Sequence, residues 1–229
     1  MNGRHLLPAV AMAVLCGCTA PPPPAPPPVA VLAPAAARQQ LTNGSATCDF
    51  DVTWLTVSGI DEGAAATANA ALDLTPEPAD CAETTTINGG YRGQALNERG
   101  VLSVAYLVTR SVPGGAYPNQ TLQTFVIDLR TGQEIPLDDV LTPAGRAAFV
   151  DACGKGLDPR LDPNDLCRTT YDTGPDAPYT VTRDGLVAQP YNEVPHAAQA
   201  LAEQGVLVPW AALGDGLRPG TPIAALAGR

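Results

Sequence analysis

Apolar and polar residues alternate along several segments of this chain, as they do in strands with one buried face. From Thr47 to Val57 this pattern predicts a strand with Phe50, Val52 and Trp54 on one side. The most continuous apolar run is 101–112, which predicts a buried strand. Weaker alternation predicts further strands at 83–97, 121–130, 179–182, 186–189 and 205–208, with a short edge segment at 135–137.

An alanine-rich segment, Ile60–Leu74, predicts a helix. Asp61 and Glu62 fall in its first turn, where the helix dipole favours carboxylates, and Pro76 ends it. Ser58, just ahead of the helix, is a residue type that caps helix N-termini. The residues expected on the buried side of this helix are Ile60, Ala64, Thr67, Ala71 and Leu74.

A second helix is predicted where Thr142 precedes Pro143, because a hydroxyl cap followed by a first-turn proline favours a helix start. It continues to Cys153, and a short helical turn is expected at 210–213. Hairpins dominate the connections between the predicted strands. This mixture indicates an α+β fold, a single domain in which an antiparallel sheet is packed by two or three helices.

The N-terminus has the features of an export signal. Arg4 precedes an apolar run, Leu6–Leu15, that is too short to span a bilayer. Leu15-Cys16-Gly17-Cys18 resembles a bacterial lipobox, which implies removal of residues 1–17 and a lipid on Cys18. The alternative is an ordinary secretory signal with a chance cysteine. Residues 18–39, rich in proline and alanine, are predicted to form an extended tether, with the folded domain at 40–229.

A lipid on Cys18 would attach the protein to the cell envelope. Thr19 follows this cysteine, in place of the aspartate that usually retains such proteins in the inner membrane. The resemblance therefore implies the periplasmic side of the outer membrane, if the organism has two membranes.

Acidic residues outnumber basic ones by 23 to 13, for a formal net charge of −10. Lysine and arginine form no cluster, so nucleic acid and anionic lipid surfaces are improbable partners. The negative charge favours a cationic partner or simply keeps the protein soluble.

Four cysteines remain after Cys16 and Cys18, and in an exported domain they are most simply two disulfides. Sequence alone allows three pairings. Glycine and Asp-Pro pairs between Cys153 and Cys167 describe a loop in need of a cross-link, which favours that pair and leaves Cys48 with Cys81. The thiols lack the spacing and the nearby histidine of a metal site, so we expect no metal and no other cofactor.

Motifs between residues 97 and 217 resemble, in order and spacing, those of a bacterial domain family. They are Leu102-Ser103, Gly114-Gly115-Ala116, Asp128–Gly132, Leu137–Leu141 and, in weaker form, Tyr191–Ala197 and Val208–Leu213. On these residues the chain is similar to the RsiV-like, or DUF3298, family. Segment 47–96 resembles the smaller strand-helix-strand module often found before that domain.

The resemblance implies a fold more than an activity. Family members include membrane-tethered anti-sigma factors whose outer domain binds lysozyme, a secreted antigen, and modules attached to polysaccharide deacetylases, whose chemistry resides in another domain. This chain has Tyr117 where the family loop carries histidine, and the anti-sigma role is not expected because no sigma-binding segment is recognised. We expect a non-enzymatic protein that binds an extracytoplasmic protein or glycan, with cationic lysozyme as the first candidate. The expected contact loop is Gly114, Gly115, Ala116, Tyr117, Pro118 and Asn119.

The alternative is an envelope esterase or other hydrolase. After export His196 is the only histidine, so a serine mechanism must use it, with Ser58 or Ser103 as nucleophile. Neither serine lies in a G-x-S-x-G elbow. A structural role is the simpler interpretation of all three residues.

Carboxylates give two further candidates. Asp138 and Asp139 are adjacent on a segment expected to be extended, so they would point to opposite faces and could not act as a glycosidase pair. Asp158, Asp162 and Asp165 loosely resemble a calcium loop but lack its glycine and terminal glutamate. Turn formation by Asp-Pro pairs explains them more simply.

Overall fold

The structure, a computed structural model, describes residues 25–81, 83–92, 96–172 and 177–228. The predicted signal, Cys18 and Thr19 lie outside these residues. No helix in the described ranges has both the length and the apolar character needed to cross a bilayer.

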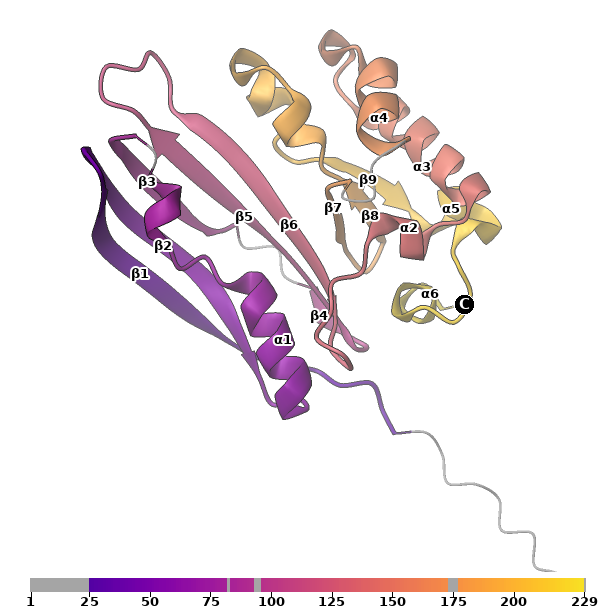
Figure 1. Cartoon of the computed structure of the whole chain (residues 1–229). Coiled ribbons are helices and arrows are strands. Elements are labelled where there is room, and N and C mark those ends of the chain that lie inside the picture. Colours follow the sequence, from indigo (N-terminus) through magenta and orange to yellow (C-terminus); the bar gives the residue numbers. More distant parts are fainter. Residues whose placement is uncertain (1–24, 82, 93–95, 173–176, 229) are drawn as a thin grey trace, which may run out of the picture.

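A six-stranded sheet is the framework of the molecule (Figure 1). β5 lies at its centre, with β6 along one edge and both β3 and β4 along the other. β2 pairs in parallel with β3, and β1 forms the outer edge; the remaining pairs of this sheet are antiparallel. The strands are β1 (Val31–Asn43), β2 (Ala46–Ser58), β3 (Thr85–Tyr91), β4 (Leu96–Glu98), β5 (Val101–Ser111) and β6 (Asn119–Asp128).

A second, three-stranded antiparallel sheet is formed by β7 (Tyr179–Val181), β8 (Gly185–Ala188) and β9 (Val206–Pro209). The α-helices are α1 (Glu62–Leu72), α2 (Leu137–Val140), α3 (Pro143–Gly156), α4 (Pro163–Tyr171), α5 (Trp210–Leu213) and α6 (Pro222–Leu226). Short 3₁₀ segments are η1 (Pro78–Asp80), η2 (Pro159–Leu161), η3 (Pro190–Glu193), η4 (His196–Leu201) and η5 (Gly214–Gly216).

Successive residues of β5 point to opposite faces of the large sheet, and because this strand is mostly apolar in its first half, both faces carry apolar side chains. Other elements cover each face. Leu102 and Val104 pack with Leu72 of α1 in one core. Val101 packs with Phe149 of α3 and the small sheet in the other core. The α+β prediction is therefore confirmed, with two sheets and more helices than the sequence indicated.

Residues 31–39 are the main correction to the sequence-based prediction: they form most of β1 and are not tether. The composition, rich in proline and alanine, predicted an extended tether here, but Pro34 occupies a register that a strand tolerates. It lies opposite Leu55, whose N–H donates to the hydroxyl of Tyr106 on the side away from β1. This pair exchanges no bonds across the ladder, so Pro34 costs no backbone hydrogen bond.

The helix α1 starts later than predicted and buries a different stripe. Asp61 is its cap, accepting from the N–H of Ala64, and the proposed cap Ser58 instead ends β2. Spacing by four residues places Ala64, Ala68 and Leu72 inward. Small residues on this stripe allow the turn at Gly132 to approach closely: a Cβ there would lie 2.0 Å from the carbonyl oxygen of Ala64.

Both predicted disulfides, Cys48–Cys81 and Cys153–Cys167, are present. The segment between Cys153 and Cys167 is not the open loop expected from its composition, because it contains η2 and the start of α4. The Asp-Pro pairs start these two helical segments: proline at the first position suits a helix start, and Asp158 also accepts from the N–H of Arg160.

The carboxylate candidates have structural roles. Asp138 and Asp139 lie in the first turn of α2, not on an extended segment, and Asp138 pairs with Arg146. Asp158 pairs with Arg160, and Asp165 pairs with Arg168.

Candidate binding surface

The predicted contact loop connects β5 to β6 at one end of the large sheet (Figure 1). Its turn is closed by a bond from the N–H of Gly115 to the carbonyl of Val112, and Gly114 adopts a φ of 80°, which glycine accommodates without strain. Tyr117 is the most exposed large apolar side chain among the described residues, at 74 %. Proteins usually bury most of an aromatic ring, so this exposure marks the loop as a candidate contact.

The structure brings this loop together with His196, although the two were separate candidates in the sequence. The rings of Tyr117 and His196 have centroids 5.2 Å apart at an interplanar angle of 42°. His196 is exposed at the start of η4, and its Nδ1 lies 3.1 Å from Oε1 of Gln199. Tyr117 is therefore supported from one side by a ring that is itself oriented.

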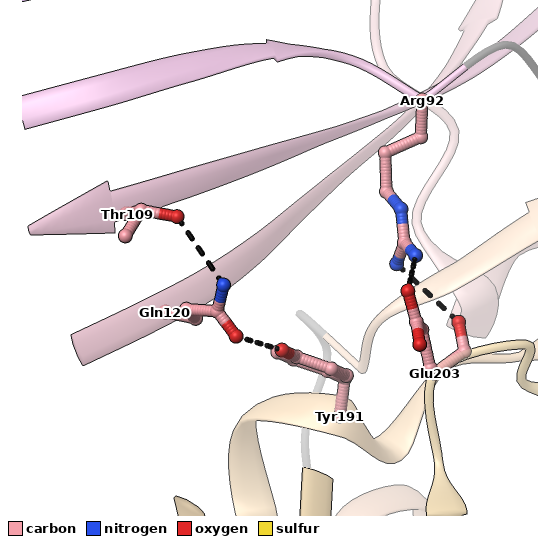
Figure 2. A network of polar contacts seen from close by, with 5 residues as sticks. All are labelled: Arg92, Thr109, Gln120, Tyr191 and Glu203. Carbon is pink, nitrogen blue, oxygen red and sulfur yellow. Dashed lines mark hydrogen bonds and ion pairs between the residues drawn. The ribbon is translucent and has the colours of Figure 1, made fainter. Parts of the chain in front are cut away.

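A polar network joins the two helical segments η3 and η4 to β6. Tyr191 of η3 donates to Oε1 of Gln120 at 2.8 Å, and Nε2 of Gln120 lies 3.4 Å from the hydroxyl of Thr109 (Figure 2). Gln199 reaches the carbonyl of the same Gln120 at 3.5 Å. Because Gln120 immediately follows the loop, the network ties both sides of the surface to one strand end.

Asn192 adds a second attachment. Its side-chain amide accepts from the N–H of Leu122 and donates to the carbonyl of Leu122, both at 2.8 Å. The two bonds are those that a neighbouring strand would make, so the N–H and the carbonyl of Leu122 at the edge of β6 are both satisfied. Sequence reasoning missed Asn192, Gln120 and Gln199 because isolated amides carry no spacing signal.

An ion pair flanks the network. Arg92, at the end of β3, donates to the carboxylate of Glu203 at 2.5 Å and to its carbonyl at 3.3 Å (Figure 2). With Gln189 and Leu122 these residues line a hollow of about 240 Å³ between the large sheet and the C-terminal part. Burial raises the pKa of nearby Tyr191.

The hydrolase candidates do not form a site. Ser103 has no exposed surface, and its hydroxyl accepts from the N–H of Val181 at 2.8 Å, which links β5 to the small sheet. Ser58 donates to the carbonyl of Val31. The side-chain partners of His196 are Gln199 and Tyr117, so the geometry places neither serine beside it.

Comparison with solved structures identifies the architecture. No family model and no curated protein matches the chain. A DUF3298 family member from Bacteroides fragilis superimposes with a TM-score of 0.58 at 13 % identity, over 87 % of this chain and 98 % of that one. The chain has a DUF3298-like fold. A DUF3298 family protein from Pseudomonas aeruginosa agrees, with a TM-score of 0.53 at 16 % identity over 84 % and 95 % of the two chains.

The DUF3298-like fold confirms the resemblance drawn from the motifs at 97–217. Matches of such low identity establish the fold alone. The matched share of this chain is larger than the segment 97–217 that carries those motifs.

Proposed function

We propose that this chain is a non-enzymatic envelope lipoprotein whose DUF3298-like domain binds an extracytoplasmic protein. The contact surface is the loop 113–119 together with His196. The observation that carries the proposal is Tyr117, an exposed aromatic ring held in place by a second ring.

Tyrosine is enriched among residues that dominate protein interfaces, since it buries a large area and has few rotamers to lose. Contact with His196 limits those rotamers before binding, which lowers the entropic cost of association. The network through Gln120 fixes the opposite side of the surface in the same way.

The partner we expect is cationic, because the chain carries a formal net charge of −10. Charge complementarity of this kind speeds encounter and weakens with salt. Lysozyme is the first candidate, from the resemblance of the sequence motifs. An envelope glycan is the alternative partner.

Attachment to the envelope rests on the lipobox-like segment and Cys18. Ala30 is buried, and its N–H and its carbonyl both bond to the side-chain amide of Asn97, so the tether is limited to residues 18–29. At about 3.1 Å per residue for extended proline-rich chain, it would hold the domain up to about 40 Å from the lipid.

Calorimetric titration with lysozyme tests the binding surface. The soluble chain 19–229 contains every described residue and omits Cys18. We expect Tyr117→Ala to weaken binding at least about tenfold, the scale of an interface hot spot. The matched control is Leu207→Ala, because Leu207 is 48 % exposed on β9, outside the surface.

Equal affinities for the wild type and Tyr117→Ala would show that the loop is not the contact. Absence of heat at tens of micromolar protein would remove lysozyme as the partner. The titration is then repeated with soluble peptidoglycan fragments, and binding of these that depends on Tyr117 would identify a glycan partner.

A further inference from the structure

A groove of about 480 Å³ lies on the face of the large sheet that also carries α1. Its floor is apolar, formed by Phe50, Val52, Ile87 and Val108 from three adjacent strands. Polar side chains stand around this floor: Asp73, Thr75, Arg110, Asn119, Thr121 and Gln123. It is separate from the hollow beside Arg92.

The groove exists because α1 is too short to cover the whole sheet. α1 ends at Leu72, and the chain then runs through η1 to Cys81 (Figure 1). We call this segment the side wall, and its residues 73–76 line the groove. The disulfide to Cys48 holds the end of this wall, and Gln39 donates to the carbonyl of Pro76 in its middle. The wall is therefore anchored independently of any ligand.

The sequence of this wall is acidic: from Asp73 to Cys81 it contains three acidic residues and no basic one. Asp73 lines the groove, and its Oδ1 accepts from both the N–H and the hydroxyl of Thr75, at 2.8 and 2.6 Å. These bonds fix the carboxylate in place, and no hydrogen bond to its second oxygen occurs among the described residues.

The opposite side of the groove has an acceptor without a donor. Oε1 of Gln123 is buried and has no hydrogen-bond partner among the described residues. A buried unpaired acceptor is unfavourable, and the amide of glutamine rotates easily about its last torsion. A ligand that brings N–H donors into the groove would satisfy it.

We propose that the groove receives a long basic side chain, arginine or lysine, from the protein partner. Such side chains combine an aliphatic stem, which suits the floor at Val52 and Val108, with a cationic head that suits Asp73 and Gln123. The inference rests on the proposed function and names the chemistry that the partner presents. Asn119, the last residue of the contact loop, also lines the groove. One partner would therefore contact the loop and the groove together.

Arg110 lines the same groove with a positive charge, so it allows the electrostatic part of the proposal to be tested in the opposite direction from Asp73. A basic side chain is opposed by this charge and drawn by Asp73. Neutralising the two residues should therefore change its affinity in opposite directions.

The experiment titrates a tri-arginine peptide with acetylated and amidated ends into the soluble chain 19–229 at low salt. Asp73→Asn should weaken binding at least fivefold, and it keeps the acceptor for Thr75. Arg110→Gln should strengthen binding several-fold. The matched control is Asp184→Asn, an exposed carboxylate in the turn before β8 that makes the same change in net charge.

Tri-citrulline with the same blocked ends has nearly the same shape without charge, and we expect it not to bind. Equal effects of Asp73→Asn and Asp184→Asn, or equal binding of the two peptides, would overturn the proposal. The lysozyme titration separates the groove inference from the proposed contact surface at Tyr117. If Tyr117→Ala weakens lysozyme binding and Asp73→Asn does not, the groove inference fails while the proposed surface stands; the reverse result removes the surface and keeps the groove.

Discussion

Loss of the Cys153–Cys167 disulfide should destabilise the domain by about 3 kcal/mol. The cross-link spans a sequence separation of 14, and the loop-closure entropy of an unfolded chain for a ring of that size corresponds to about 3 kcal/mol. Both cysteines are fully buried in the core around α3 and α4. Substitution of both by alanine avoids leaving buried polar groups.

The helices should stay packed without the bond. Phe149 and Tyr171 meet edge to face with centroids 5.1 Å apart, and Arg146 donates to the carbonyl of Tyr171. The main effect is therefore on the unfolded chain, which becomes less restricted. Urea denaturation followed by tryptophan fluorescence and far-UV circular dichroism measures the loss, and the slope against urea should rise as the unfolded chain expands.

The second disulfide is the internal control. Cys48–Cys81 has a sequence separation of 33, so the same model predicts a loss about 0.8 kcal/mol larger for its removal. A loss below about 1 kcal/mol for the shorter ring, or a larger loss for the shorter ring than for the longer, would refute the entropic reasoning. A peptide joining Cys48 to Cys153 or Cys167 in a non-reducing map would refute the pairing.

Three further predictions test other contacts. Ser103→Ala should cost about 1 to 3 kcal/mol, because the buried N–H of Val181 loses its acceptor; urea denaturation would show this, and a neutral result would contradict it. The Arg160 guanidinium lowers the pKa of Asp158 to about 2. Arg160→Gln should raise that pKa toward its ordinary value in an NMR titration, so that the carboxylate protonates at higher pH. Detergent partitioning should find the wild type with membranes and Cys18→Ser in the soluble fraction, and identical partitioning would exclude lipid attachment.

Local chemistry in the sequence determined several features of this protein. The hydroxyl of Thr142 accepts from the N–H of Gly145 at the start of α3, where the Thr-Pro pair predicted a helix. β5 lies where the continuous apolar run at 101–112 predicted a buried strand, β6 lies within reach of the strand predicted at 121–130, and both cysteine pairs agree with the prediction. These features were predictable because each depends on neighbouring residues or on a small number of possible pairings.

Only the tertiary structure decided the rest. The proline-rich segment at 31–39 joins the sheet because β2 offers a complete edge and Pro34 falls in a register that needs no N–H. His196 stands against Tyr117 because η3 is attached to β6 through Gln120 and Asn192. The groove is open because α1 ends before the strands beneath it do. Each depends on contacts between residues distant in the chain, and those contacts are set by the folded sheet and not by any local pattern.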